Sequence, residues 1–407
     1  MVLAVSVRKK KARCEYMQFE NAKQAAERMN VTVRAVQKWA KEGRLPGSYF
    51  DNRIWWIPKN ITEPLKKSEV KPVVEIKRYQ LPLLRSSFDV GSAREFIDSI
   101  PDSDDRNIAL AEYYYYTGQA EKAAELLEPY INSEDDSLRY SANVMCTFAN
   151  IFRGHIHLAT FFSDNVSKQL EEGLKNENIS QEIKATAVLT AYIGKYLLNV
   201  SVPDVPPLEE YLHFLPNGIR LYGAYILAYK AYKDKNFERA IGICDTALAF
   251  CNSFYPIAAI YVLIVAAASF MGLKKPQLAR QHFMIAWETA KQDGLIKLFG
   301  IHHNLLQGLT DQCLKADYPE DYKKIMKIVK EFNDGWYRLH KPEEYDYSHT
   351  LSPVEISVAV LYNRDWGSKE IAVHLKLSER MVKKHIRDIY DKLFVTSKNE
   401  LKKYLEK

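Results

Sequence analysis

Residues 367–395 constrain the fold of this 407-residue chain more strongly than any other segment. Their pattern predicts two short helices joined by a tight turn, because apolar residues recur at helical spacing along the second helix. The opposite face of that helix carries a basic stripe at positions i, i+3, i+4 and i+7, namely Arg380, Lys383, Lys384 and Arg387. One face is thus suited to packing, and the other is suited to a polyanion such as DNA.

The same layout recurs near the start of the chain. Residues 21–43 predict a first helix, a turn, and a second helix that begins at an N-cap, Thr32. We expect Val33, Val36 and Ala40 to face the core. The polar positions of the second helix again follow the i, i+3, i+4, i+7 spacing: Arg34, Gln37, Lys38 and Lys41.

Charge is segregated along the chain. Residues 1–80 hold 18 Lys and Arg against 8 Asp and Glu, residues 350–407 hold 12 against 8, and residues 81–349 hold 27 against 35. Basic ends attract a polyanion and an acidic middle repels one, so we expect the ends to bind double-stranded DNA and the middle to do something else.

The composition argues against several other classes of protein. The five cysteines form no CxxC pair, which favours reduced thiols in a cytoplasmic protein and no metal site. The start MVLAVSVRKK is unlike a secretory leader, because its charges follow the apolar stretch. Residues 254–273 lack charge and approach membrane-spanning length, but Pro256 and the many alanines favour a buried helix and no membrane.

The pattern divides the chain into three parts joined by linkers. Residues 48–50 and 53–57 predict two strands after the first pair of helices, which makes residues 1–60 a winged helix-turn-helix. Residues 61–87 and 341–350 predict linkers. A capping box formed by Ser352 and Glu355 marks the start of the last domain, residues 351–407.

The middle part, residues 88–340, predicts consecutive helices. A small or turn residue recurs with an alanine five positions later, as in Gly118 with Ala123, Gly154 with Ala159 and Lys235 with Ala240; Gly272 with Ala279 fits with two residues inserted. This part resembles tetratricopeptide repeats, which form an α-solenoid. The fold class expected is therefore mainly α.

The C-terminal part resembles the LuxR family of bacterial regulators, whose DNA-binding domain has four helices. The resemblance covers residues 351–401 and is carried by the run Lys369 to Ala372, by Val382 with Lys383, and by the Lys392–Leu393 pair. It departs from the family pattern at Met381, where Thr is usual, and at Phe394, where Gly is usual. The resemblance implies DNA contacts by Lys383, Lys384 and Arg387; our candidates in this domain also include Lys369, Ser378, Arg380 and His385.

The N-terminal part is similar to excisionase-like, MerR-related domains. Residues 17–59 carry the segment Glu42 to Pro46 and the wing Arg53 to Pro58 that are typical of that group. The resemblance implies that the second helix enters the major groove and that the wing reaches the adjacent minor groove. It makes Arg34, Lys38 and Arg53 candidate DNA contacts.

Two further groups have more than one interpretation. His385 beside the basic stripe could bind a metal, but a lone histidine is more often a packing or phosphate-contacting residue. The four tyrosines Tyr113, Tyr114, Tyr115 and Tyr116 could line a ligand-binding surface or pack between repeats, and packing is the safer interpretation. The chain lacks the common phosphate-loop, hydrolase and zinc-protease motifs, so we expect neither an enzyme nor a cofactor.

These observations predict a bacterial transcription regulator that acts as a homodimer. Both ends would bind DNA, and the repeat array would sense a peptide, a small molecule or a protein. Two alternatives remain open: an architectural protein that bridges DNA sites with a passive array, and an adaptor whose N-terminal domain binds protein.

Overall fold

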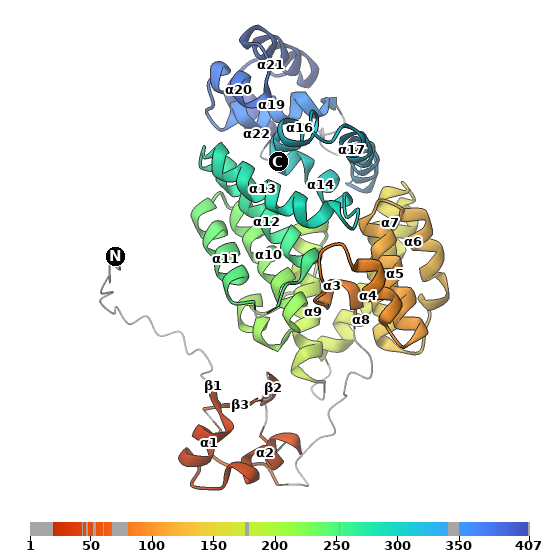
Figure 1. Cartoon of the computed structure of the whole chain (residues 1–407), viewed down its shortest axis with the longest axis vertical. Coiled ribbons are helices and arrows are strands. Elements are labelled where there is room, and N and C mark those ends of the chain that lie inside the picture. Colours follow the sequence, from red (N-terminus) through yellow and green to blue (C-terminus); the bar gives the residue numbers. More distant parts are fainter. Residues whose placement is uncertain are drawn as a thin grey trace, which may run out of the picture. The chain divides into compact units, whose positions relative to one another are not determined.

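The structure is a computed structural model of the chain. It describes residues 19–42, 44–45, 48–51, 54–59, 61–66, 80–175, 179–251, 253–340 and 350–405. The described residues form two compact units, one built from the N-terminal residues and one that contains nearly all of the chain from residue 80 onward. Most of them are helical (Figure 1).

The N-terminal unit combines two helices with a small antiparallel sheet of strand order β1-β3-β2. Asn21 caps α1 with a capping box, and the Thr32 hydroxyl accepts the Ala35 N–H at the start of α2. Val36 and Ile57 are fully buried. Its elements are β1 (Phe19–Asn21), α1 (Ala22–Arg28), α2 (Val33–Lys41), β2 (Tyr49–Asp51) and β3 (Ile54–Pro58).

Both ends of the predicted linker 61–87 belong to folded units. Residues 61–66 are tied to the N-terminal unit, because Arg28 donates to the Ile61 carbonyl at 2.7 Å and Arg44 donates to the Leu65 carbonyl at 2.6 Å. At the other end, α3 (Pro82–Arg85) buries Leu83 and Leu84 in the second unit. The buried Glu112 carboxylate accepts the backbone N–H groups of both leucines.

The second unit is a stack of helices in which sequence neighbours pack side by side (Figure 1). We call residues 82–340 the array. Its helices after α3 are α4 (Ala93–Ser99), α5 (Ser103–Tyr116), α6 (Ala120–Leu127), α7 (Asp136–Phe152), α8 (Ile156–Lys175), α9 (Gln181–Ile193), α10 (Asn217–Lys233), α11 (Phe237–Ala249), α12 (Pro256–Gly272), α13 (Pro276–Lys291), α14 (Lys297–Ile301), α15 (His303–Leu306), α16 (Leu309–Leu314) and α17 (Pro319–His340).

Four of the helix pairs share the same turn. In each, a residue in the left-handed conformation lies between the two helices, and a buried alanine follows it five positions later. The left-handed residues are Gly118, Gly154, Lys235 and Lys274, and Ala123, Ala159, Ala240 and Ala279 are at most 1% exposed. The predicted spacing is therefore confirmed for three pairs. It is wrong for Gly272, because Lys274 occupies the left-handed turn and no residues are inserted before Ala279.

Helix α12 forms the centre of the array. Its residues from Pro256 to Ser269 are buried against α10, α11 and α13. The uncharged segment noted in the sequence is therefore a core helix, as expected. Within the described parts of the chain, no helix combines the length and the apolar character needed to cross a membrane.

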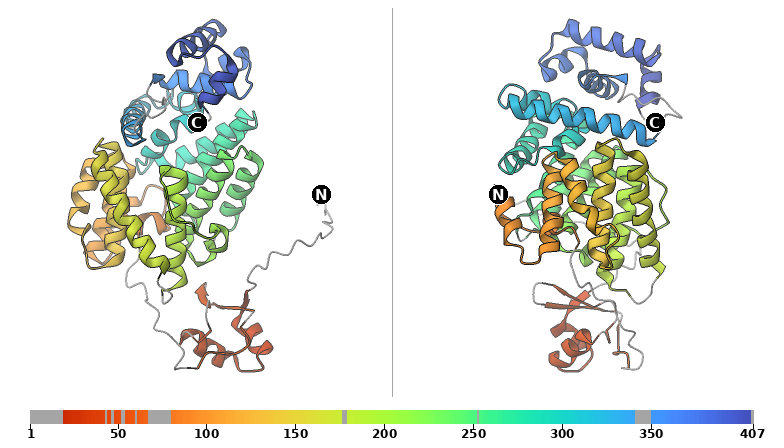
Figure 2. Two further views of the ribbon diagram at one scale, coloured as in Figure 1. Left: turned by 180° about the vertical axis from the view of Figure 1, so that it is seen from behind. Right: turned by 90° about the vertical axis from the view of Figure 1, so that its right-hand side faces the viewer.

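The last four helices form a small domain at one end of the array (Figure 2). Ser352 and Glu355 make the predicted capping box, and Glu355 also pairs with Lys392 at 2.7 Å. We call residues 350–405 the C-terminal domain. Its helices are α19 (Pro353–Asn363), α20 (Ser368–Leu375), α21 (Glu379–Leu393) and α22 (Lys398–Leu405).

The C-terminal domain packs on the array through α19 and α20. The buried His374 ring is 3.1 Å from the Gln307 carbonyl. Arg364 donates to the Tyr232 hydroxyl at 2.6 Å and lies over the rings of Tyr232 and Phe237. These contacts join segments that are far apart in the sequence, so the domain and the array form one continuous structure.

A sharp left-handed turn at Gln307 and Gly308 makes this close approach possible. Gly308 has a φ of +86°, and a Cβ at that position would lie 2.2 Å from Cδ2 of Leu375 in α20. Only glycine satisfies both the backbone conformation and the lack of space.

One lysine is buried in the array without a hydrogen-bonding partner among the described residues. The Nζ atom of Lys297 lies 3.5 Å from the ring centroids of Tyr115 and of Phe152, and the side chain is fully buried. Cation–π attraction to these two rings favours the charged form of the amine but only partly offsets the cost of burying it. Taking an ammonium ion out of water costs several kcal/mol. Burial therefore lowers the pKa of Lys297 well below its usual value.

We predict that Gly308→Ala loosens the C-terminal domain from the array. The left-handed backbone alone costs about 1–2 kcal/mol for a residue with a Cβ, and the contact with Leu375 adds to it. Hydrogen–deuterium exchange of the α20 amides should therefore become faster. Gly242→Ala is the matched control, because a Cβ at position 242 in α11 meets no atom within 4 Å. Unchanged α20 protection in Gly308→Ala would contradict the tight approach.

We predict that Lys297→Met raises the free energy of unfolding of the array, and that the gain depends on pH. The folded chain holds Lys297 at a lowered pKa, so the unfolded chain binds the extra proton between that pKa and about 10.5. The wild-type protein should therefore gain stability relative to the variant as the pH rises toward 10.5. Urea unfolding at several pH values measures this difference. A constant difference would mean that Lys297 keeps its ordinary pKa.

Candidate nucleic-acid interface

The C-terminal candidate site is the outer face of α21. The turn before it contains Lys376 with a φ of +55°, and the Ser378 hydroxyl accepts the Met381 N–H to cap the helix. Val382, Ile389 and Leu393 are buried. The predicted basic stripe is exposed on the other face: Arg380, Lys383, Lys384 and Arg387.

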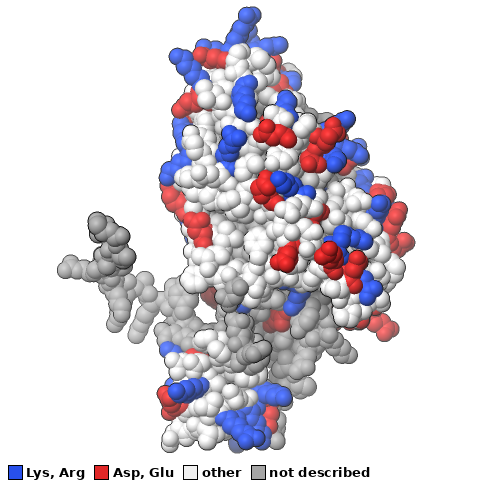
Figure 3. Space-filling model, viewed as in Figure 1, with Lys and Arg blue, Asp and Glu red and all other residues white. Residues whose placement is uncertain are grey.

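Nothing in the described part of the array covers this stripe. Helix α21 packs on α19 and α20, and these are the helices through which the domain contacts the array. In both views of Figure 2, α21 lies on the side of the domain away from the array. Figure 3 shows lysine and arginine side chains gathered at this end of the second unit. The stripe is therefore accessible in the docked arrangement.

The other candidates of this domain lie at the edge of the stripe. Lys369 is exposed on α20, and Ser378 is exposed at the N-terminus of α21. Lys383 makes an i,i+4 ion pair with Glu379 at 2.6 Å, which lowers the pKa of the Glu379 carboxyl. An exposed pair of this kind contributes little to stability, so the lysine can exchange Glu379 for a phosphate.

His385 is half-buried beside the stripe. Its ring nitrogen, Glu355 and Asp388 lie within 4.8 Å of one another, which is close enough for a metal ion. However, the Glu355 carboxylate already accepts from the Ser352 N–H and hydroxyl and from Lys392. These bonds lower the pKa of Glu355 against the effect of burial. The carboxylate is thus committed to holding α19 against α21.

Phe394 ends α21 in the left-handed conformation, with a φ of +53° and 87% of its surface exposed. The backbone thus follows the course that the usual glycine would give, although a Cβ makes it costly. The sequence did not predict the direction of the fourth helix. In the structure, α22 packs on α19.

The N-terminal candidate site is the outer face of α2. Thr32, Arg34, Gln37, Lys38 and Lys41 are all exposed. Val36 and Ala40 face the core as predicted, but the prediction for Val33 is wrong, since 38% of its surface is exposed. Val33 is the first residue of α2 and lies at its exposed N-terminal end. Arg53 lies outside the described residues.

Sequence reasoning missed the structural role of two basic residues in this unit. Arg28 pairs with the buried Glu20 at 2.6 Å and also bonds the Ile61 carbonyl. Arg44, which lies over the Trp39 ring, bonds the Leu65 carbonyl. Both hold the unit together. The sequence around positions 28 and 44 does not distinguish these two arginines from arginines on the surface.

The four tyrosines of α5 do not form one surface. Tyr115 and Tyr116 are at most 4% exposed and contact Phe152 and Tyr261 in the core. Tyr113 and Tyr114 are half-buried beneath Arg94 and Lys122. Packing accounts for the two buried rings.

A two-helix unit with an exposed cationic face on its second helix is the arrangement of a DNA-binding domain. The comparison with known families agrees. Residues 349–405 match the GerE family, the bacterial regulatory proteins of the luxR family. No curated protein and no solved structure matches the chain. The chain therefore carries the DNA-binding domain of a bacterial transcription regulator.

We predict that replacing Lys383, Lys384 and Arg387 by alanine weakens DNA binding by roughly 1–3 kcal/mol for each side chain that contacts the duplex. The slope of log affinity against log salt should flatten by about 1 for each phosphate partner removed. Fluorescence anisotropy with genomic fragments at several salt concentrations measures both effects.

The matched control replaces Lys402 and Lys403 of α22, which are exposed in the same domain but lie off the stripe. This control should change affinity much less. Because the variant removes three charges and the control two, the losses are compared per charge removed. Equal losses per charge would show that binding follows net charge and does not depend on the face of α21.

Proposed function

We propose that the chain regulates transcription by binding double-stranded DNA with both ends, and that the array between them senses a ligand or partner. DNA binding by the C-terminal domain, the C-terminal reader, is supported by the exposed basic stripe of α21, which lies within the residues that match the family. The sensing role is supported by one observation, the packing of this domain on the array. Because the two are in direct contact, a change in the array can change the position of the DNA-binding helices.

The N-terminal unit supports a second reader. Helix α2 follows α1 after a short turn, has exposed cationic residues on one face, and precedes the β2–β3 hairpin. In a winged helix-turn-helix, such a helix enters the major groove and the hairpin lies beside the DNA. Arg34 is then the better candidate for a base contact, and Lys38 and Lys41 for phosphates.

The docking supports sensing over a passive spacer. A spacer needs only to hold two readers apart. Here α20 fits against a turn that requires glycine, and a buried histidine and an arginine reach from the domain into the array. The stripe stays uncovered in this arrangement, so the proposed control acts on the orientation or pairing of readers. Occlusion of α21 by the array is not required.

The N-terminal reader is tested by replacing Arg34 and Lys38 with alanine. We predict weaker DNA binding and a salt slope flatter by about 1 for each phosphate partner removed. The control replaces Lys168 and Lys275, two exposed lysines of the array, and so removes the same charge elsewhere. If the N-terminal unit is an adaptor for protein, the Arg34 and Lys38 variant will bind DNA as the control does.

A further inference from the structure

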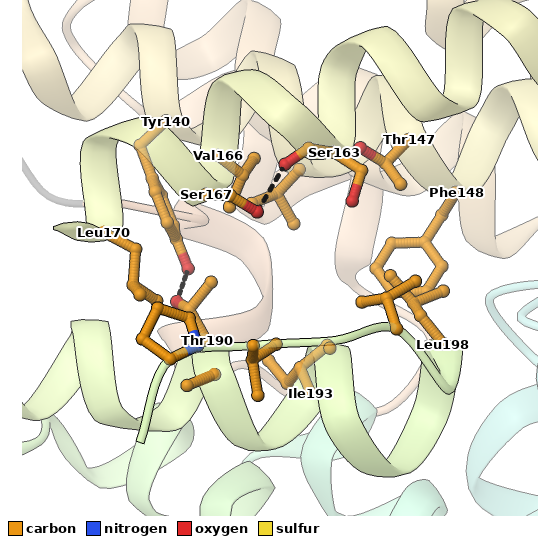
Figure 4. A pocket seen from close by; sticks show the side chains of 16 residues that line it. Tyr140, Thr147, Phe148, Ser163, Val166, Ser167, Leu170, Thr190, Ile193 and Leu198 are labelled. Carbon is orange, nitrogen blue, oxygen red and sulfur yellow. Dashed lines mark hydrogen bonds between the residues drawn. The ribbon is translucent and has the colours of Figure 1, made fainter. Parts of the chain in front are cut away.

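We infer that the array contains a binding site for a small, neutral, mainly apolar molecule with a hydrogen-bond donor, in the cavity between α7, α8 and α9. This inference rests on the proposed sensing role and gives it a place and a ligand class. The cavity is partly open to solvent and its interior space is small, about 40 Å³, so a ligand is only partly enclosed. Figure 4 shows its walls, with Tyr140 and Leu170 at one end and Phe148 and Leu198 at the other.

The cavity lies where the packing of the array divides. Two small hydrophobic clusters are separate from the main core here. One contains Ile151, Ala159 and Leu198, and the other contains Leu170, Ala187 and Ala191. Leu198 and Leu170 of these clusters also line the cavity. Protein interiors are otherwise densely packed, and an apolar gap forfeits dispersion attraction along every wall. A ligand that fills the gap therefore restores this attraction.

An irregular stretch of backbone forms one wall. Helix α9 continues into a π-helical turn, η3 (Gly194–Leu198), which ends at Asn199 with a φ of +52°. A Cβ on Gly194 would lie 2.9 Å from Cγ1 of Val202, so the chain folds back closely over the turn. Val200, Val202 and Pro203 of the returning segment line the cavity. Single π-turns of this kind are frequent at functional sites.

The lining defines the charge of the ligand. All of its residues are uncharged, and most of the surface is carbon. A carboxylate or phosphate would lose its hydration there without a cationic partner, which costs several kcal/mol. The site therefore selects neutral molecules.

The hydroxyl groups of the lining define the polar end of the ligand. Thr147 donates to the Asn143 carbonyl, Ser167 to the Ser163 carbonyl and Thr190 to the Thr186 carbonyl. Because the Thr190 proton is used in this way, Tyr140 is the donor in its bond to Thr190. Each hydroxyl has one proton and two lone pairs. These four groups thus offer acceptors to a ligand donor such as an alcohol, and the Ser163 hydroxyl, which also lines the cavity, can donate or accept.

The cavity is linked to the helix that leads to the C-terminal domain. Phe148, Leu198 and Val200 share a hydrophobic cluster with Trp336 and Leu339 in the last turns of α17. Gly335 lets α17 cross α7 in direct contact, since a Cβ there would lie 1.9 Å from the Ile151 carbonyl oxygen. Helix α17 also packs on α16, which contacts α20. A ligand that moves the Leu198 wall therefore acts on the support of the DNA-binding domain.

The test uses the full chain and four probes of similar size: benzyl alcohol and cyclohexanol as neutral donors, toluene without a donor, and benzoate as an anion. We expect the two alcohols to raise the Tm with increasing concentration, toluene to raise it less, and benzoate to leave it unchanged. Saturation-transfer NMR should show the alcohols in contact with the protein.

The matched variants are Val144→Phe, which fills the cavity from α7, and Ser167→Ala, which removes one acceptor and keeps the cavity open. Circular dichroism establishes that each is folded. Val144→Phe should abolish the effect of the alcohols, and Ser167→Ala should weaken it several-fold. If Val144→Phe does not fold, Ser167→Ala decides, because an unchanged response in that variant overturns the site. The site is also overturned if no alcohol binds or if binding survives in Val144→Phe.

The DNA-binding assay separates this inference from the proposed function. If the alcohols bind in the cavity and DNA affinity and stoichiometry do not respond, the site stands and the sensing role fails. If DNA binding through α21 is normal and no alcohol binds, the cavity inference alone fails.

Discussion

The fit of α20 against the turn at Gln307 and Gly308 is the constraint on which the second unit depends. It places His374 against a backbone carbonyl and brings Arg364 over two aromatic rings of the array. It also fixes which face of the C-terminal domain is used for packing. Since α19 and α20 face the array, the basic stripe of α21 stays exposed to a duplex.

The two DNA-reading candidates follow the same physical rule. In both, small or branched apolar residues bury one side of a short helix, a hydroxyl caps its N-terminus, and cations occupy the exposed side. Val36 and Ala40 perform the packing in α2, and Val382, Ile389 and Leu393 perform it in α21. The array between them is acidic, so it adds no attraction for phosphate of its own.

Features set by local chemistry could be predicted from the sequence. The capping box of Ser352 and Glu355 and the buried faces of the two helices depend on residues within a few positions of each other. The error at Gly272 shows a limit of this reasoning. Lysine at 274 adopts the left-handed turn at some cost, and the glycine instead makes room for the Phe237 ring.

Features that join distant segments could not be predicted. The contact between His374 and Gln307 spans 67 positions, and the cavity collects side chains from three helices and a returning segment. Lys297 likewise lies between two rings of other helices. In each case the surroundings of the residue depend on how distant helices pack against one another. The order of residues along one segment does not reveal this packing.

Site-specific photocrosslinking tests the central claim most directly. A photoreactive amino acid is placed at position 384 on the stripe of α21, and another is placed at position 168 on the array. The account predicts salt-sensitive crosslinks from position 384 to a bound DNA fragment and none from position 168. Crosslinks absent at 384, or equal at the two positions, would contradict a duplex bound along α21.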